Sequence, residues 1–346
     1  MPLAGVFVPP YVTPALARRH IEASHVSESP RAMSQRHSFT QATGMFVSET
    51  HTEAVTWQFT VTEMLAAGRT KFQEYQICEV PRFGKTLFLD YNIQSSLMDE
   101  HVFHECMSQP AMTLHPHPRK ILVCGGGEGA TLREALKHRT VEQAVMVDID
   151  EELVEMVKIH MPEWHQGAFD DPRTILLHED ARAYVARHKG AGFDVILSDL
   201  PNPHGEGPAQ MLFTREYFSA CAEAMSEDGV FAMQAGCANA NYPYLFASNW
   251  ETLESMREVF PFVAGYYGLV TSFFMPWGFM LASKRHDPLA LSADEIASRF
   301  RSRDVETRYY TPRMHHAAFT LPEYLYEAKA AHGRVLTDAE PYAWDA

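Results

Sequence analysis

The stretch Ile121-Leu122-Val123-Cys124-Gly125-Gly126-Gly127-Glu128-Gly129 decides the fold of this 346-residue chain, because it joins an apolar run directly to a cluster of glycines. A short, continuous apolar run is typical of a strand that is buried on both faces of a parallel sheet. Glycines after such a strand let the backbone turn tightly and approach a ligand closely. We therefore predict a strand, a ligand-binding turn and then a helix.

Similar apolar runs recur toward the C-terminus, with amphipathic stretches of helical period between them. The expected strands are 144–147, 174–177, 193–197, 230–233, 263–269 and 278–283, and the expected helices are 131–138, 151–160 and 214–225. Strands that alternate with helices in this way indicate an α/β domain with a doubly wound, mostly parallel sheet. We assign this Rossmann-like domain to residues 116–290.

Three short segments of strand character precede this domain, and glycine and proline turns separate them. They are residues 54–61, 74–80 and 86–90. They predict a small antiparallel β-domain over residues 46–115, with a helix from about residue 99 to residue 112 leading out of it.

The two ends of the chain lack a sustained period. Residues 1–45 are rich in proline, serine, histidine and arginine, and we expect an irregular N-terminal extension there. Residues 291–346 contain prolines and aromatic residues, and we expect a segment of helical and irregular structure that packs on the body, with a helix over 323–331.

The composition is that of a soluble globular protein, with 46% hydrophobic and 21% charged residues. The apolar runs fall short of the roughly 20 residues that span a bilayer, and the N-terminus lacks the pattern of a secretory signal. Five scattered cysteines without a CxxC pair predict a reduced, cytoplasmic chain with no structural metal. The formal net charge of −15 disfavours nucleic acid and suits a cationic substrate, although plain solubility is the commoner reason for an acidic surface.

Acidic residues follow the predicted strands and indicate an adenosine ligand. Asp148 lies about 20 residues beyond the glycines, where a carboxylate holds ribose hydroxyls, while Asp150 suits a helix N-cap. Asp180 ends the third strand, where it would meet an adenine amino group, and Asp199 ends the fourth. Glu128 occupies the place of phosphate oxygens, so its charge disfavours a dinucleotide and favours an S-adenosyl cofactor with its sulfonium.

As a set, these motifs resemble those of the polyamine aminopropyltransferase (spermidine synthase) family. The resemblance runs in order from Trp57 to Lys284. It rests on Gly125–Gly129 with Arg133-Glu134, Val147–Asp150, Asp170–Arg173, Glu179-Asp180 with Tyr184, Phe83-Gly84 with Leu87 and Leu89-Asp90, Ile93-Gln94, Asp99-Glu100 with His104-Glu105, and Met233–Gly236. Three details look closer to thermospermine synthase: Glu128 in the glycine loop, Asp199-Leu200 with Pro203, and Ser272-Phe273 with Trp277-Gly278.

The resemblance implies transfer of the aminopropyl group of decarboxylated S-adenosylmethionine to an amine, with release of methylthioadenosine, on a sheet of S-adenosylmethionine-methyltransferase type. It implies no metal, and it implies a homodimer or a higher homo-oligomer. By the same resemblance, the cofactor would be bound by Gln73, Gln94, Gly125, Gly127, Asp148 and Asp180, with Glu128 on the aminopropyl ammonium. Asp199 would accept the proton of the attacking amine. The acceptor would be lined by Phe103, His104, Glu128, Asn202, Gln234, Ser272 and Trp277.

Asn202 is the main departure, because the family usually has an aspartate there. An amide still accepts a hydrogen bond but carries no charge for a cationic acceptor. Three outcomes are open: a different acceptor, which we favour, a replacement carboxylate such as Glu206, or a slow enzyme. Phe103 lacks the hydroxyl of the tyrosine that the family often has, and Ser272 stands for a residue that is often tyrosine, which suggests room for a longer acceptor.

Other functions are compatible with parts of the pattern. A methyltransferase that uses intact S-adenosylmethionine would share the fold and the ribose carboxylate. A non-catalytic, polyamine-binding descendant would explain Asn202, and a dehydrogenase with a nicotinamide cofactor is the weakest alternative. Nothing in the residue types chooses among putrescine, spermidine, cadaverine, agmatine and a diamino acid as the acceptor.

Overall fold

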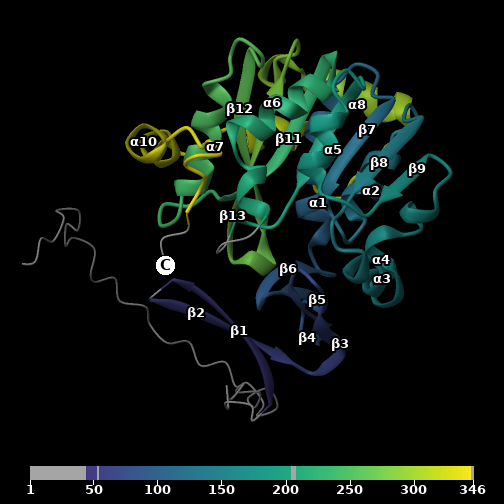
Figure 1. The fold of residues 1–346 in the computed structure, drawn as a ribbon, viewed down its shortest axis with the longest axis vertical. Coiled ribbons are helices and arrows are strands. Elements are labelled where there is room, and N and C mark those ends of the chain that lie inside the picture. Colours follow the sequence, from purple (N-terminus) through teal and green to yellow (C-terminus); the bar gives the residue numbers. More distant parts are fainter. Residues whose placement is uncertain (1–43, 53, 204–207, 344–346) are drawn as a thin grey trace, which may run out of the picture. The chain divides into compact units, whose positions relative to one another are not determined.

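The computed structural model describes residues 44–52, 54–203 and 208–343. These residues form a two-stranded hairpin, a four-stranded sheet and a seven-stranded sheet flanked by helices (Figure 1). We expected an irregular extension over residues 1–45. Residues 1–43 lie outside the described residues, and Met45 already begins a strand. Among the described residues, no helix is long and apolar enough to cross a membrane.

The two small sheets are antiparallel and share one apolar cluster. The hairpin consists of β1 (Met45–Thr52) and β2 (Val55–Val61), and the four-stranded sheet has the order β3 (Glu63–Arg69), β4 (Glu74–Val80), β5 (Gly84–Leu89) and β6 (Asn92–Ser96). Phe59 of the hairpin packs edge-on against Phe88 of β5, with ring centroids 5.1 Å apart. The small antiparallel β-region is therefore confirmed, although β1, β3 and β6 were not predicted.

The large sheet confirms the prediction of a mostly parallel, Rossmann-like architecture. Its order is β12 (Phe262–Val270), β13 (Met275–Ser283), β11 (Met225–Cys237), β10 (Phe193–Asp199), β7 (Lys120–Gly125), β8 (Gln143–Val147) and β9 (Thr174–Leu177). Strands β7 to β11 run parallel, and β13 and β12 continue the sheet in antiparallel pairing. The chain reverses its strand order beside β7, which places the ends of β7 and β10 together.

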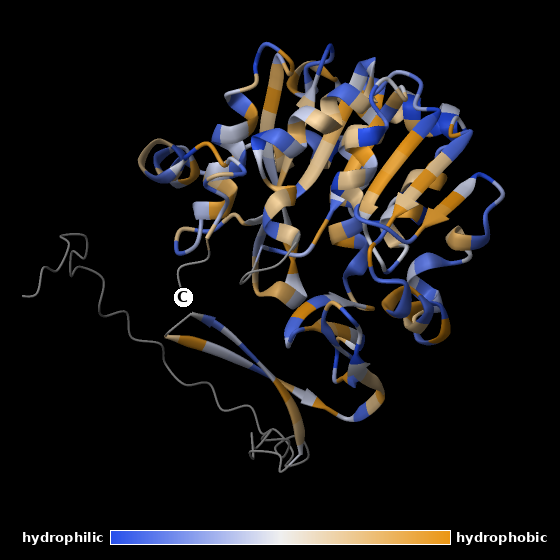
Figure 2. Cartoon of the chain, viewed as in Figure 1, coloured by the Kyte–Doolittle hydropathy of each residue, from blue (hydrophilic) through white to orange (hydrophobic). Residues whose placement is uncertain are grey.

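Helices cover both faces of this sheet, which is why its strands are apolar on both sides. The helices are α1 (Glu100–Leu114), α2 (Ala130–Leu136), α3 (Glu151–His160), α4 (Pro162–His165), α5 (Ala181–Arg187), α6 (Arg215–Ala224), α7 (Tyr244–Glu254), α8 (Ala293–Arg303), α9 (Pro312–Ala318) and α10 (Glu323–His332). Ile121 and Val123 of β7 enter one core with α1 to α3 and α8, whereas Leu122 and Cys124 enter the other with α5 to α7. The hydrophobic colour of the central strands is visible in Figure 2.

Helix α1 carries a proline in its interior, and a tyrosine from the sheet compensates for it. Pro110 has no N–H, so the carbonyl of Cys106, four residues earlier, lacks its helical partner. The hydroxyl of Tyr266 on β12 donates a hydrogen bond to this carbonyl, at 2.9 Å. The helix is almost wholly buried, so water cannot serve instead.

We expect Tyr266→Phe to lower the free energy of unfolding by about 1–3 kcal/mol, because it leaves the buried Cys106 carbonyl without a partner. Denaturant unfolding followed by circular dichroism measures this difference. Tyr326→Phe is the matched control, since the Tyr326 side chain is exposed. Equal stability of the two variants would show that the Cys106 carbonyl does not need this hydrogen bond.

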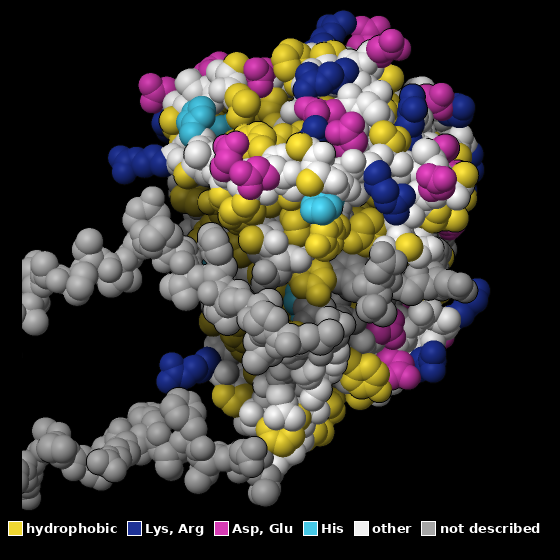
Figure 3. All heavy atoms as spheres, turned by 90° about the vertical axis from the view of Figure 1, so that its left-hand side faces the viewer, with side chains coloured by type: hydrophobic (Ala, Val, Ile, Leu, Met, Phe, Trp, Pro, Cys, Tyr) yellow, Lys and Arg dark blue, Asp and Glu magenta, His cyan; other side chains and the backbone are white. Residues whose placement is uncertain are grey.

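The C-terminal segment returns to the body beyond the large sheet. Helix α10 confirms the predicted helix at 323–331, but α8 was missed although Ser292 and Glu295 form a capping box at its start. Further along, Asp338 accepts a hydrogen bond from the Thr214 hydroxyl, at 2.7 Å, and pairs with Arg182. Figure 3 shows acidic and basic side chains interspersed over one face of the molecule.

Candidate active site

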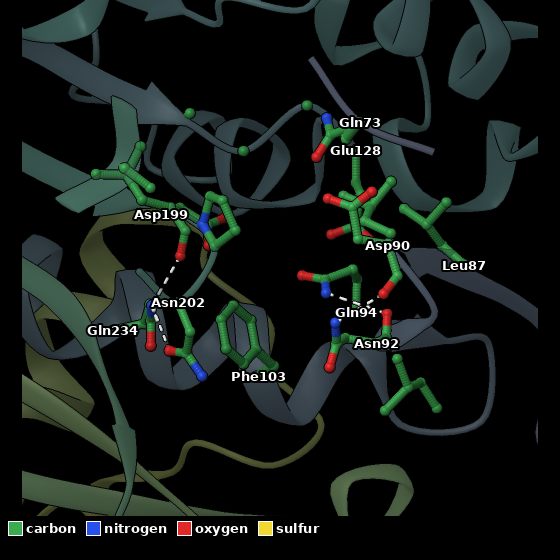
Figure 4. Close-up of a pocket in the computed structure, with 18 of the residues that line it drawn as sticks. Gln73, Leu87, Asp90, Asn92, Gln94, Phe103, Glu128, Asp199, Asn202 and Gln234 are labelled. Carbon is green, nitrogen blue, oxygen red and sulfur yellow. Dashed lines mark hydrogen bonds between the residues drawn. The ribbon is translucent and has the colours of Figure 1, made fainter. Parts of the chain in front are cut away.

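A cavity of about 950 Å³ is lined both by the C-terminal ends of the parallel strands and by residues of the small sheets. It brings together most residues singled out in the sequence: Gln73, Gln94, Phe103, Gly125, Gly127, Glu128, Asp148, Asp180, Asp199, Asn202, Gln234 and Trp277. In Figure 4, Asp199, Asn202 and Gln234 lie on one side of the cavity, and Gln73, Glu128 and Gln94 lie on the other. Glu206, the suggested replacement carboxylate, lies outside the described residues.

The glycine turn after β7 packs directly against the end of β10. The Gly126 N–H donates to the Asp199 carbonyl oxygen at 2.8 Å. Gly125 has φ +75°, and a Cβ atom there would lie 2.2 Å from the same oxygen. Glycine is thus required at residue 125 by its backbone conformation and by the neighbouring strand. This packing places the Asp199 side chain beside the turn.

Asp199 is a partly buried carboxylate with one close hydrogen-bond donor. The Thr131 hydroxyl donates to its Oδ2 at 2.6 Å. Burial raises the pKa of Asp199, and the nearby charge of His104 and the Thr131 hydrogen bond offset part of that rise. A carboxylate with a raised pKa is a better proton acceptor than one in water.

Gln234 and Asn202 form a fixed pair of amides beside Asp199. The Gln234 Nε2 donates to the Leu200 carbonyl at 2.7 Å and to Asn202 Oδ1 at 3.2 Å, and its Oε1 accepts from the Gly236 N–H at 2.9 Å. The Gln234 amide is therefore held on both ends. The carbonyl oxygen of Asn202 serves Gln234, which leaves its NH₂ group for other partners.

Glu128 faces Asp199 from the other side of the cavity (Figure 4). Its Oε2 accepts a hydrogen bond from the Nε2 of His104 at 3.3 Å. Its Oε1 is buried and has no hydrogen-bond partner among the described residues. A buried carboxylate oxygen without a donor is costly unless a ligand supplies one.

The acidic residues after β8 and β9 complete the rim. Asp148 accepts from the Asp150 N–H at 2.9 Å, and burial raises its pKa to about 6. Asp150 caps α3 by accepting from the Leu153 N–H at 3.1 Å, as predicted, and it also accepts from the Gln73 Nε2 at 2.9 Å. Asp180 is exposed at the rim, where it caps α5. Gln94 lines the cavity and donates to the Asn92 carbonyl at 3.1 Å.

Two predicted residues, His104 and Ser272, do not contribute to the lining. His104 is buried behind Glu128, because its ring turns toward Glu100 one helical turn earlier. Ser272 donates from its N–H and its hydroxyl to the Asp99 carboxylate, at 2.7 and 2.8 Å, so it holds the start of α1 and does not face the cavity. The expectation that Ser272 lines the acceptor site is therefore wrong.

The hairpin contributes lining residues that the sequence analysis missed. Glu49 of β1 accepts from the Ile93 N–H at 3.1 Å, and burial raises its pKa to about 7. His51 stacks on Trp57 with ring centroids 4.7 Å apart, and its edge meets Tyr242 at 5.4 Å. The sequence contains one sign that Glu49 is buried. It lies two residues after the apolar Val47, and residues two apart on a strand share one face.

Comparisons with known proteins find relatives over most of the chain. The spermine/spermidine synthase domain matches residues 100–291, and the spermidine synthase tetramerisation domain matches residues 45–96. Polyamine aminopropyltransferase 1 of Hyperthermus butylicus is 44% identical over 76% of this chain and 89% of its own length. The polyamine aminopropyltransferase of Pyrobaculum calidifontis is 44% identical over 73% of this chain and 87% of its own length.

Solved structures of spermidine synthases have the same fold. One is in complex with the transition-state analogue AdoDATO; it is 30% identical, has a TM-score of 0.77, and the match covers 84% of this chain and 96% of that chain. The spermidine synthase of Thermotoga maritima is also 30% identical, with a TM-score of 0.74 and the same coverage.

Proposed function

The chain belongs to the spermine/spermidine synthase family, and from this we infer that its cavity transfers an aminopropyl group from decarboxylated S-adenosylmethionine to an amine. The observation that supports this site most directly is the buried, unpartnered Oε1 of Glu128 across the cavity from Asp199. An ammonium group would supply the donor that this oxygen lacks. The carboxylate of intact S-adenosylmethionine would instead be repelled there, which argues against a methyltransferase.

The residues predicted to bind the co-substrate all line the cavity. Asp148 and Asp180 would hold the ribose and the adenine, at the ends of β8 and β9. Gln73 and Gln94 also line the cavity, and Gly125 and Gly127 give the backbone its close approach. Glu128 would then hold the aminopropyl ammonium.

The reaction is an in-line displacement at the carbon beside the sulfonium. The neutral amine nitrogen of the acceptor forms a bond to this carbon, the carbon–sulfur bond breaks, and its electron pair returns to sulfur to give methylthioadenosine. A free amine has a pKa of about 10, so the acceptor must lose a proton. Asp199 would accept this proton, and Gln234 would hold Asn202 in place beside it.

A second ammonium group of the acceptor would meet Glu49. Asn202 has no charge, and Glu49 is a carboxylate in the wall of the same cavity, close to the aromatic rings of His51 and Trp57. Carboxylates and aromatic faces both attract ammonium groups. We therefore propose a diamine or polyamine acceptor, with Glu49 in place of the charge that residue 202 lacks.

Release of methylthioadenosine from decarboxylated S-adenosylmethionine, measured against a panel of amines with mass spectrometry of the products, tests the function. A product heavier than one amine by an aminopropyl group would establish the acceptor. Binding of the co-substrate without any product would favour the binding-protein alternative.

We expect Glu49→Gln to raise the KM for the acceptor about tenfold at pH 8, with kcat nearly unchanged, because a charge-assisted hydrogen bond is lost. Glu49 has a pKa of about 7 and binds a cation only when ionised, so the wild-type KM should fall as the pH rises from 6 to 8. The variant should lack this dependence. Glu63→Gln, at an exposed position, is the control. An unchanged KM at pH 8 would remove Glu49 from the acceptor site.

The match to a tetramerisation domain over residues 45–96 indicates a homo-oligomer. We propose a dimer or tetramer, which light scattering of the purified chain would distinguish from a monomer.

We also propose a cytoplasmic location, because the five cysteines are free and buried; cell fractionation tests it. The exclusion of nucleic acid partners and the closer likeness to thermospermine synthase stay predictions.

A further inference from the structure

His104 lies between two carboxylates in the wall behind the cavity. It is in the second turn of α1, and its side chain is 1% exposed. Its Nδ1 is 3.0 Å from Glu100 Oε2 and 2.7 Å from the Glu100 carbonyl oxygen. Its Nε2 is 3.3 Å from Glu128 Oε2. Both ring nitrogens therefore face oxygen atoms of acids.

This arrangement determines the protonation of the ring. An ionised carboxylate can only accept hydrogen bonds, and a neutral imidazole has only one N–H. Two carboxylates, one on each nitrogen, are both satisfied only by the doubly protonated imidazolium. Burial alone would lower the pKa of His104, but the hydrogen bonds to Glu100 and Glu128 raise it to about 10.

Glu100 is itself held as an anion from the far side. Arg133 of α2 donates from Nη1 to Oε1 at 3.3 Å and from Nη2 to Oε2 at 2.9 Å. Burial would raise the pKa of Glu100, but hydrogen bonds from His104 and Arg133 lower it to about 2. Beyond it, Arg133 pairs with Glu134, which also pairs with Lys137. Positive and negative groups thus alternate from the surface of α2 to Glu128.

We propose that His104 is a positioning residue: as a permanent imidazolium clamped by Glu100, it fixes Glu128 through Oε2, leaves Oε1 for the substrate ammonium, and supports the ionised form of Asp199. The kinetic test of this inference rests on the proposed function, because it measures turnover. The ammonium of the co-substrate would extend the alternating row by one positive charge.

The charged groups that face His104 come from each neighbouring element. They are Glu100 on α1, Glu128 in the turn after β7, and Asp199 at the end of β10, with Arg133 on α2 behind Glu100. Burial raises the pKa of Asp199 most, the charge of His104 lowers it, and the charge of Glu128 raises it. Removing the imidazolium therefore leaves two mutually repelling carboxylates in one cavity.

The first experiment measures the protonation of the His104 ring directly, by NMR of the full-length protein labelled with ¹⁵N-histidine. The His104 signal, assigned by its loss in His104→Gln, should show a doubly protonated ring from pH 6 to pH 9. Glu100→Gln keeps His104 and removes one partner, so the ring should begin to lose its proton within this range. A wild-type ring that titrates between pH 6 and pH 8 would overturn the proposal.

The second experiment compares the pH profiles of kcat/KM for decarboxylated S-adenosylmethionine. In His104→Gln the acid limb should move upward by roughly 1–3 pH units, because Asp199 loses the neighbouring positive charge that lowers its pKa. His104→Lys, which restores a cation, should recover part of this shift. His315→Gln is the control: its ring is also fully buried, between the Tyr310 hydroxyl and the Pro288 carbonyl.

The outcomes separate this inference from the proposed function. Equal profiles for His104→Gln and His315→Gln would overturn the positioning role, even in an active enzyme. A doubly protonated ring in a protein that transfers no aminopropyl group to any amine would overturn the proposed function and leave the clamped imidazolium in place.

Discussion

Asp199→Asn is expected to lower kcat by about 10³-fold while the protein still binds methylthioadenosine with nearly unchanged affinity. The variant keeps the shape of the side chain and the hydrogen bond from Thr131, but it cannot accept the proton of the attacking amine. The main-chain contact between Asp199 and Gly126 is also preserved, so the turn that faces the co-substrate should stay in place.

Single-turnover kinetics and calorimetric binding of methylthioadenosine measure the two quantities separately. Asp228→Asn is the matched control, because this carboxylate pairs with Arg285 at the surface, 3.1 Å away. The control should have wild-type kcat. A large loss of methylthioadenosine binding in Asp199→Asn would make Asp199 a structural residue instead of a proton acceptor.

Glu128→Gln is expected to weaken binding of decarboxylated S-adenosylmethionine by roughly 10- to 100-fold, which corresponds to about 1.5–3 kcal/mol for a hydrogen bond to a charged group. The reason is the buried Oε1, which has no donor among the described residues and would receive one from the aminopropyl ammonium. The same change should reduce discrimination against intact S-adenosylmethionine, because the carboxylate that repels it is gone.

Methylthioadenosine is the internal control for this variant, since it lacks the aminopropyl group. Its dissociation constant should change little, and calorimetry with the three ligands provides the comparison. Equal losses for methylthioadenosine and decarboxylated S-adenosylmethionine would contradict the assignment of Glu128 to the ammonium.

The part of the site that could be predicted is the part fixed by topology. Asp148, Asp180 and Asp199 each follow a parallel strand, and such strands end at the same edge of the sheet. The glycine turn likewise has a local cause in the sequence. The same reasoning predicts a doubly wound, mostly parallel sheet, although not the order of its strands.

The missed or misplaced residues depend on packing between distant segments. His104 and Phe103 are neighbours on α1, but only Phe103 reaches the cavity, because the elements packed around the helix decide which side faces it. Ser272 turns toward Asp99, which is far away in sequence. Glu49 lies on β1, which pairs with β2. A single carboxylate in a short strand does not by itself indicate that the strand lines a cavity.

The hairpin β1–β2 has less support from neighbouring strands than the other strands that line the cavity. Within the described part of the chain its strands pair only with each other, and a two-stranded hairpin is marginal unless it packs on a neighbour, here through Phe59. Asp199 and Gln234, which also line the cavity, instead lie on β10 and β11 of the seven-stranded sheet. Warming should therefore loosen the hairpin first, so that Glu49 leaves the proposed acceptor site while Asp199 and Gln234 are still in place.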